Sequence, residues 1–258
     1  MSDGQVTLQR DGAIARVWFD RPEARNAMTA AMYRQFADIC RSLAKDTALR
    51  AVVLRGVGGK AFVAGTDISR FRDFTYGDDG VAYEREMEAH IADLCMIAVP
   101  VLAVIEGYAV GGGLNIAAAC DLRIATTGSR FGVPIARTVG NCLAMPSYAR
   151  LVSGFGESRA KRMLLLGELL DAREAQDAGF LVRVVEPADL DSTLAALVAQ
   201  LEGNAPLSLA ASKEAIRRVT TRDVPEGDDL IRRVYGSEDF KRGIRAFFDK
   251  SKPDWRGE

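Results

Sequence analysis

The sequence has little of what marks several common protein classes. It carries one histidine, His90, and its four cysteines, Cys40, Cys95, Cys120 and Cys142, lack the paired spacing of a metal site. Opposite charges nearly cancel to a formal net charge of -1, which provides no broad attraction for nucleic acid or an anionic membrane. No window approaches the roughly 18 continuous apolar residues of a membrane span. We therefore expect no metal, no nucleic acid and no membrane.

The cysteines and the N-terminus also predict where the protein works. Three of the cysteines lie in apolar or helical surroundings, where a buried thiol in a reducing cytosol is the usual interpretation. The polar start, M-S-D-G-Q-V, has no apolar signal core. Because 48% of the 258 residues are hydrophobic, the chain can bury a large core. We expect a cytoplasmic protein with one domain and an appendage.

A glycine triplet after a buried strand organises the chain. The apolar run from Val99 to Ile105 is typical of a strand covered on both faces, and Gly111 to Gly113 and a buried helix over 114–120 follow it. Glycines let a ligand approach the backbone, and unpaired amides at a helix N-terminus favour negative charge. Such a turn suits a phosphate or an oxygen that becomes negative during a reaction. It also suits simple close packing, and it lacks the spacing of nucleotide-binding motifs.

A second glycine-rich turn occurs earlier, between Gly56 and Ile68. It follows the predicted buried strand Ala51–Gly56, and small residues lead from it to Asp67. Two such turns, each after a buried strand, could each supply a backbone amide to one site.

The remaining pattern predicts an α/β core followed by helices. Asp11 and Gly12 form a turn pair between two apolar segments, 6–8 and 13–19, and thus predict a hairpin. We expect a helix over 29–45, capped by Thr29, and a second helix over 81–97. A loop is expected from 129 to 146, a strand over 181–185, and only helices after about 188. The charges in the second helix are expected to face solvent: Glu84, Arg85, Glu86 and Glu88.

Six segments carry a resemblance to a known family. They are R-P-E-A-R-N-A-M, K-A-F-V-A-G-T-D-I, V-P-V-L-A-V-I-E-G-Y-A-V-G-G-G, C-D-L-R-I-A, R-F-G-V-P and S-E-D-F-K-R-G-I-R-A-F-F-D-K. In this order they span nearly the whole chain, which resembles the enoyl-CoA hydratase/isomerase, or crotonase, superfamily. The resemblance implies a spiral of ββα units with a coenzyme A thioester site in residues 1–195. It implies a helical region in residues 196–258 that forms a trimer or a dimer of trimers.

The resemblance also implies a set of site residues and a place in fatty acid metabolism. In the family two backbone amides hold the thioester oxygen, and the matching residues are Thr66 and Gly112. An acyl-CoA is then the substrate, with no covalently bound cofactor. The positions matching coenzyme A contacts are Arg25, Ala27, Ala64, Asp67, Ile68, Gly111, Phe247 and Lys250, of which the last two match a pair that reaches the coenzyme A of a neighbouring subunit.

The sequence departs from the family at both hydratase glutamates. Asn115 stands at the first position and Ile135 at the second, and no Asp or Glu lies between Asp121 and Glu157. Hydration needs a base for water and an acid for the α-carbon. An amide and an isoleucine supply neither, so two-glutamate hydration and glutamate-dependent isomerisation are both in question.

Three hypotheses remain. The first is an enzyme whose base lies elsewhere, with candidates Asp67, Asp73, Glu84, Glu86, Glu88 and His90. The second is a decarboxylase of malonyl-type thioesters, in which Asn115 or Asn141 orients the carboxylate. The third is a non-catalytic acyl-CoA binder or scaffold. An isolated histidine is more often surface or interfacial than catalytic. Four aromatic residues are expected either to line an acyl pocket or to pack a mobile segment: Phe71, Phe74, Tyr76 and Tyr83.

Overall fold

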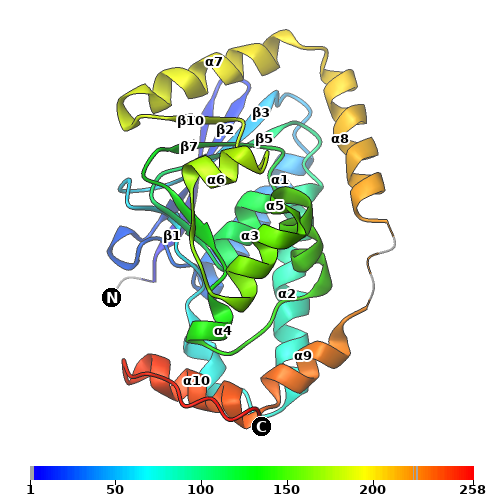
Figure 1. Cartoon of the computed structure of the whole chain (residues 1–258). Helices are drawn as coiled ribbons and strands as arrows, with labels where there is room; N and C mark the ends of the chain where they lie inside the picture. The colour runs from blue at the N-terminus through cyan, green and yellow to red at the C-terminus, as the bar shows by residue number, and fades with distance from the viewer. Residues whose placement is uncertain (1–2, 223, 225) are drawn as a thin grey trace.

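The chain folds around two β-sheets, as a computed structural model that describes residues 3–222, 224 and 226–258 shows (Figure 1). The larger sheet has the order β1-β2-β3-β5-β7-β10, and the smaller has the order β4-β6-β8-β9. The larger comprises β1 (Gln5–Asp11), β2 (Ile14–Asp20), β3 (Ala51–Gly56), β5 (Val101–Ile105), β7 (Leu122–Thr126) and β10 (Arg183–Val185). The smaller comprises β4 (Ala61–Val63), β6 (Tyr108–Val110), β8 (Arg130–Gly132) and β9 (Leu170–Asp171).

Strands β3 to β8 alternate between the sheets. In the larger sheet, β3, β5 and β7 pair in parallel, and in the smaller one β4, β6 and β8 do the same. A helix follows each pair of strands: α2 (Gly77–Cys95), α3 (Gly112–Ala119) and α4 (Ile135–Thr138). Parallel neighbours require such crossovers. Successive ββα units therefore wind into a spiral, and the predicted α/β fold class is confirmed.

The first hairpin and helix follow from local sequence. β1 and β2 pair antiparallel on either side of Gly12, whose φ of 59° suits glycine in the tight turn. Helix α1 (Ala30–Ala44) begins after Thr29, whose hydroxyl accepts a hydrogen bond from the amide of Met32 at 3.2 Å. Both elements occur where the sequence predicts them.

Two sequence predictions need correction. The segment from 129 to 146 is not a loop, because it contains β8, α4 and the start of α5 (Met145–Leu165). β8 has only three residues, and it is a strand because it pairs with β6 and β9. Its local sequence therefore does not predict it. Helix α2 begins at Gly77 instead of 81. The Asp79 carboxylate there accepts hydrogen bonds from the amides of Thr75 and Tyr76 at 2.7 and 2.8 Å.

The remaining helices cover the sheets and form the C-terminal region. They are α6 (Ala172–Asp177), α7 (Leu190–Gly203), α8 (Pro206–Thr220), α9 (Asp228–Tyr235) and α10 (Glu238–Phe248), with short 3-10 turns η1 (Pro22–Ala24), η2 (Ile68–Asp73) and η3 (Pro187–Asp189). None of the helices in the described part of the chain has the length and hydrophobicity that crossing a membrane requires.

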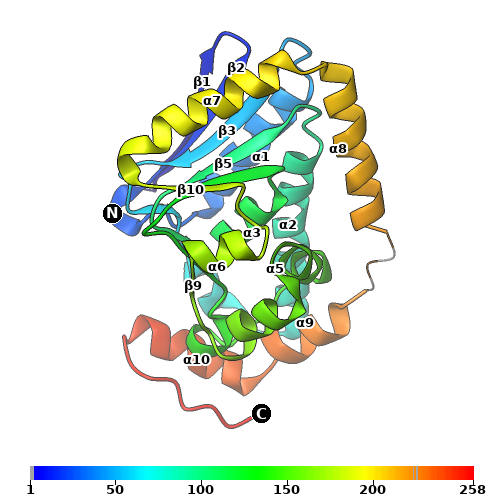
Figure 2. The same ribbon diagram turned by 45° about the horizontal axis from the view of Figure 1, so that its top comes forward.

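Helix α7 lies across one face of the larger sheet (Figure 2). Its Leu194 and Val198 are buried against Val53 and Val104 of the strands. The main core lies on the opposite face, under α1, α2, α3 and α5. The predicted boundary after residue 195 falls inside α7, and the division into core and oligomerisation region stays a prediction.

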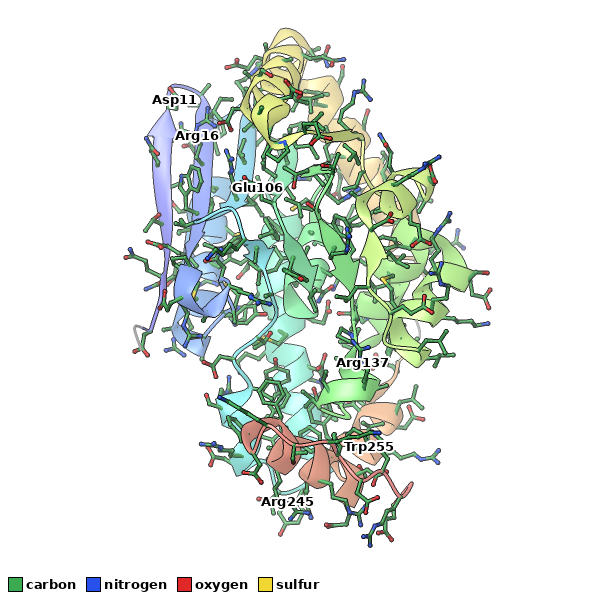
Figure 3. All side chains as sticks on the ribbon, turned by 60° about the vertical axis from the view of Figure 1, so that its left-hand side comes forward. Asp11, Arg16, Glu106, Arg137, Arg245 and Trp255 are labelled. Carbon is green, nitrogen blue, oxygen red and sulfur yellow. The ribbon has the colours of Figure 1, made fainter. Side chains whose placement is uncertain are left out.

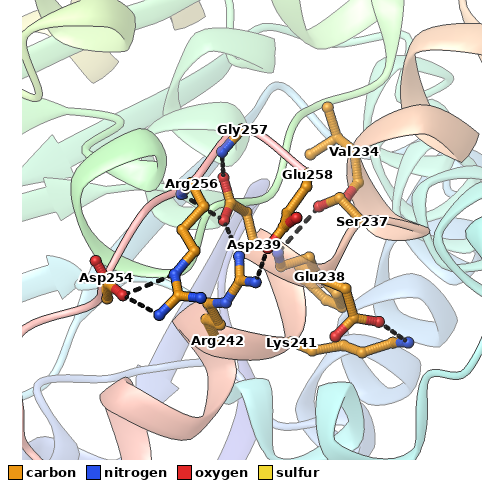
Figure 4. A network of polar contacts seen from close by, with 11 residues as sticks. Val234, Ser237, Glu238, Asp239, Lys241, Arg242, Asp254, Arg256, Gly257 and Glu258 are labelled. Carbon is orange, nitrogen blue, oxygen red and sulfur yellow. Dashed lines mark hydrogen bonds and ion pairs between the residues drawn. The ribbon is translucent and has the colours of Figure 1, made fainter.

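The C-terminal tail is held along α10 by polar contacts to Asp239 and Arg242, of which Arg242 pairs with Glu258 (Figure 4). Asp239 accepts hydrogen bonds from the amides of Arg256 at 2.9 Å and Gly257 at 2.7 Å. The tail carries Trp255 (Figure 3), whose ring lies so close to Gly140 and Gly243 that a β-carbon on either would come within 2.8 Å of it. The tail thereby supports the loop before α5.

Candidate active site

A cavity of about 230 Å³ lies where the two glycine-rich turns meet. Gly65 has a φ of 127° and Gly111 a φ of 55°, a region that favours glycine. A β-carbon on Gly111 would lie 3.8 Å from the α-carbon of Gly65, so the two turns are in contact. The cavity walls come from α1, the two turns, η2, α2, the α4–α5 region and α10. They include the large side chains Tyr33, Phe71, Tyr83, Met87, Leu143 and Phe247.

The two predicted amides, of Thr66 and Gly112, both belong to residues that line this cavity. The groups on either side of Thr66 pair with Met28, whose amide donates to the Gly65 carbonyl at 3.0 Å and whose carbonyl accepts from Asp67 at 2.8 Å. Gly112 is the first residue of α3, where an amide has no acceptor within the helix. Neither amide donates a hydrogen bond to another residue in the described part of the chain.

The predicted coenzyme A contacts divide into two groups. Four line the cavity: Ala64, Ile68, Gly111 and Phe247. The other four lie outside its lining: Arg25, Ala27, Asp67 and Lys250. The Arg25 guanidinium lies 5.3 Å from the ring centre of Tyr108. Phe247 lines the cavity of its own chain, whereas the resemblance implies a contact to a neighbouring subunit.

Asp67 is held in place as part of the framework. Its carboxylate lies 3.1 Å from the Arg21 guanidinium and accepts a hydrogen bond from the Ser69 amide at 3.1 Å. Burial opposes ionisation of this carboxyl, but the hydrogen bonds from Ser69 and Arg21 outweigh it and lower the pKa of Asp67. A carboxylate stabilised in this way is a weak base.

Asn115 lines the cavity and belongs to a polar network that begins at Ser147, which also lines the cavity. Its amide nitrogen donates to the Ser147 hydroxyl at 2.8 Å, and its oxygen accepts from Arg150 at 3.1 Å. Ser147 in turn donates to Glu88 at 2.5 Å, and Arg150 contacts both oxygens of Glu88. The network fixes the amide of Asn115 at both ends.

Asn141 and Ile135 also line the cavity. The amide nitrogen of Asn141 donates to the Tyr235 hydroxyl at 3.2 Å. Its side-chain oxygen is buried and has no hydrogen-bond partner among the described residues. Ile135, at the second glutamate position, presents only an apolar side chain.

Of the candidate bases, only Glu84 lines the cavity in the described structure. Asp73 is exposed, Glu86 pairs with Arg70 at 3.0 Å, and Glu88 belongs to the network of Asn115. His90 stacks on Tyr33 with ring centres 5.7 Å apart, and burial lowers its pKa.

Glu84 lies in the interior, which corrects the expectation that it faces solvent. It is 4% exposed, and its carboxyl oxygens accept hydrogen bonds from the Tyr235 hydroxyl at 2.6 Å and the Ala144 amide at 2.9 Å. Burial raises its pKa from the ordinary 4.5 to about 7. In the sequence, Glu84 stands beside further charges such as Arg85, which is exposed. The charge pattern therefore does not distinguish the buried Glu84 from its solvent-facing neighbour.

The aromatic group forms part of the same wall. Phe71 and Tyr83 line the cavity, and Phe74 packs behind them with its ring centre 5.0 Å from that of Phe71. Tyr76, in contrast, is 72% exposed. The cluster extends to Tyr235 of α9, whose ring centre lies 5.8 Å from that of Phe71, so α9 packs against this wall from outside the cavity lining.

The comparisons with known proteins agree with this architecture. A model of the Enoyl-CoA hydratase/isomerase family matches residues 9–258. The chain belongs to the enoyl-CoA hydratase/isomerase family. It is therefore an enzyme of the hydratase/isomerase family, and an acyl-CoA substrate is consistent with that membership.

Individual proteins match this chain over almost its full length. An (E)-benzylidenesuccinyl-CoA hydratase from Thauera aromatica is 33% identical over 98% of this chain and 99% of its own. The crystal structure of an enoyl-CoA hydratase/carnithine racemase from Magnetospirillum magneticum is 34% identical, with a TM-score of 0.80 over 98% and 96% of the chains. A methylmalonyl-CoA decarboxylase, 24% identical over 98% and 99% of the chains, shares the fold with a TM-score of 0.89.

Proposed function

We propose that the protein transforms an acyl-CoA thioester by stabilising its enolate with the amides of Thr66 and Gly112. The observation that carries the proposal is that both residues line one cavity while neither amide donates to another described residue. As a thioester becomes an enolate, negative charge develops on its oxygen. Preorganised amides in a site closed to water stabilise this charge, and one such donor is typically worth about 3 to 4 kcal/mol of barrier.

The hydroxyl of Tyr33 supports the geometry of this pair. It lies 2.8 Å from the hydroxyl of Thr66, and a β-carbon on Gly112 would approach both hydroxyls to within 2.6 Å. Tyr33 thus packs against both residues and restricts the space between the two turns. Burial raises the pKa of Tyr33 to about 12, so it remains a neutral hydroxyl at physiological pH.

A second candidate is decarboxylation of a malonyl-type thioester. Its support is the cavity lining, which carries the amide side chains of Asn115 and Asn141 and no carboxyl at Asn115 or Ile135, the two glutamate positions. In this reaction the electron pair of the carbon–carboxyl bond forms the enolate as CO2 leaves, so no base is needed to start it. An amide group orients a carboxylate without the repulsion that a glutamate would add.

The purified protein incubated with 2-enoyl, 3-enoyl, malonyl-type and aryl CoA thioesters, followed by mass spectrometry, separates these reactions. Gain of water on the 2-enoyl ester indicates hydration, and loss of CO2 indicates decarboxylation. A 3-enoyl ester converted at constant mass, and resolved by chromatography, indicates isomerisation. Binding of the thioesters without any conversion would favour a non-catalytic acyl-CoA binder.

The amide pair is tested by Gly112→Pro against Gly112→Ala. Both variants add a β-carbon at the same place, but only proline removes the amide donor, and proline is tolerated at the first residue of a helix. We expect turnover of the proline variant to be about 100-fold or more below that of the alanine variant. Because the added β-carbon would crowd the hydroxyls of Tyr33 and Thr66 in both variants, the comparison uses the residual turnover of the alanine variant as its reference. Measurable turnover that is equal in the two variants would exclude the Gly112 amide from the reaction.

A further inference from the structure

We infer that Glu84 is the catalytic acid and base of this site and exchanges a proton with a carbon of the bound acyl group. The inference rests on the proposed function, because it requires an enolate held beside the cavity. Glu84 is the one carboxyl among the described residues that line the cavity. It comes from α2, a different element from those that carry the two glutamates of the hydratases.

The two hydrogen bonds to Glu84 leave lone pairs of its carboxyl without a protein partner among the described residues. The Asn141 amide donates to the Tyr235 hydroxyl, and Tyr235 donates to one carboxyl oxygen of Glu84. The Ala144 amide donates to the other oxygen. Both protein neighbours act as donors, so in this arrangement neither takes the proton of the protonated carboxyl. That proton occupies a remaining lone pair.

The surroundings favour a carboxyl that can both give and take a proton. Burial destabilises the carboxylate, whereas the two donors stabilise it, and the resulting pKa of about 7 suits a general acid–base group at neutral pH. The titratable groups around Glu84 come from α1, α2, the loop before α5, α5 and α9: Tyr33, Tyr83, Glu88, Cys142, Tyr148 and Tyr235. The tyrosines and the cysteine have raised pKa values, and Glu88 pairs with Arg150.

A single acid–base group favours proton transfer at carbon over addition of water. With a 3-enoyl thioester, the Glu84 carboxylate removes an α-proton, and the electron pair of that bond forms a dienolate whose oxygen faces the two amides. The protonated Glu84 then returns the same proton to the γ-carbon, and the double bond moves to the 2-position. No oxidant, reductant or water enters. With a saturated thioester the same step exchanges α-hydrogen with solvent.

The test measures exchange of α-hydrogens of butyryl-CoA in deuterated water by mass spectrometry. We expect Glu84→Gln to slow exchange by at least about 100-fold while its affinity for butyryl-CoA, measured by calorimetry, stays within about threefold. Glu86→Gln, on the same helix but outside the cavity, should exchange like the native protein. Exchange by Glu84→Gln at the native rate would overturn the inference, and so would a native protein that binds butyryl-CoA without exchange at any pH.

Tyr235→Phe separates a chemical role of Glu84 from a structural one. It removes a donor that stabilises the carboxylate, so the pH midpoint of the exchange rate should move upward. A rate reduced equally at all pH values, with an unchanged midpoint, would contradict a role for Glu84 as the titrating base. The Gly112 pair of variants judges the amides independently. Exchange lost in Glu84→Gln but equal in Gly112→Pro and Gly112→Ala would retain Glu84 and reject the Gly112 amide.

Discussion

Replacing Glu84 by glutamine should change how the stability of the protein depends on pH. The pKa of Glu84 rises from 4.5 to about 7 in the folded chain because the carboxyl is buried. Below pH 4.5 the group is protonated whether the chain is folded or not, and it adds no penalty. Between 4.5 and about 7 only the unfolded chain releases the proton, so the native protein loses stability as the pH rises. Above about 7 the penalty is constant.

The size of the penalty follows from the shift. One pKa unit corresponds to 1.36 kcal/mol, so a displacement from 4.5 to about 7 corresponds to about 3 kcal/mol. Glutamine carries no titrating proton. Its oxygen can accept from the Ala144 amide while its nitrogen donates to the Tyr235 hydroxyl, which can itself turn to the Cys142 carbonyl 3.4 Å away. The variant should therefore fold.

The assay is urea unfolding of the native protein and of Glu84→Gln, followed by circular dichroism between about pH 4 and pH 9. Other titrating groups, His90 included, are common to both proteins and cancel in the difference of their unfolding free energies. We expect this difference to grow in favour of the variant by about 3 kcal/mol across the interval from pH 4.5 to 7, and to be flat above it. A difference that does not change with pH would refute the raised pKa.

Three further substitutions test other parts of the structure. Asn115→Glu should gain at most a trace of 2-enoyl-CoA hydration, measured by loss of enoyl absorbance, because Arg150 would hold the new carboxylate ionised; a large gain would show that this position alone limits hydration. Asn26→Ala should lower the unfolding free energy by about 2 to 4 kcal/mol in urea, because this buried side chain makes three hydrogen bonds to backbone groups; a loss below about 1 kcal/mol would contradict this. Gly113→Ala should reduce thermal stability and turnover together, because the added β-carbon would lie 2.0 Å from a carbonyl oxygen of β4. Gly128→Ala should change neither, because no heavy atom lies within 4 Å of the β-carbon that it adds.

The sequence predicts elements whose cause is local. The hairpin at Gly12, the cap at Thr29 and the buried strand β3 each depend on residues within one short segment, and each occurs as predicted. β8 and α4 were not predictable in this way. β8 exists because β6 and β9 lie beside it, and this pairing is between distant parts of the chain.

The same distinction applies to the site. Glycine turns indicate unpaired amides through local backbone chemistry, and the structure brings Thr66 and Gly112 to one cavity. For Glu84, sequence reasoning names it as one candidate base among six but cannot single it out. Its burial depends on α9 and on the loop before α5, whereas its neighbours on α2 are charged as on a solvent-facing helix. Asn141 is predicted only as a carboxylate-orienting group, and its bond to Tyr235 again requires the folded chain.

The contacts of Glu84 also determine when the site can form during folding. Its two hydrogen-bond partners are 60 and 151 residues further along the chain, so its environment requires the closure of long loops. The hairpin and the first ββα units need much shorter loops and are expected to form earlier. Trp18 lies in β2 and Trp255 in the C-terminal tail, so the chain carries a natural fluorophore in each of these regions. On a ribosome, the spiral can assemble while Glu84 is still open to water, and the proton affinity of the site is set only when the final helices arrive.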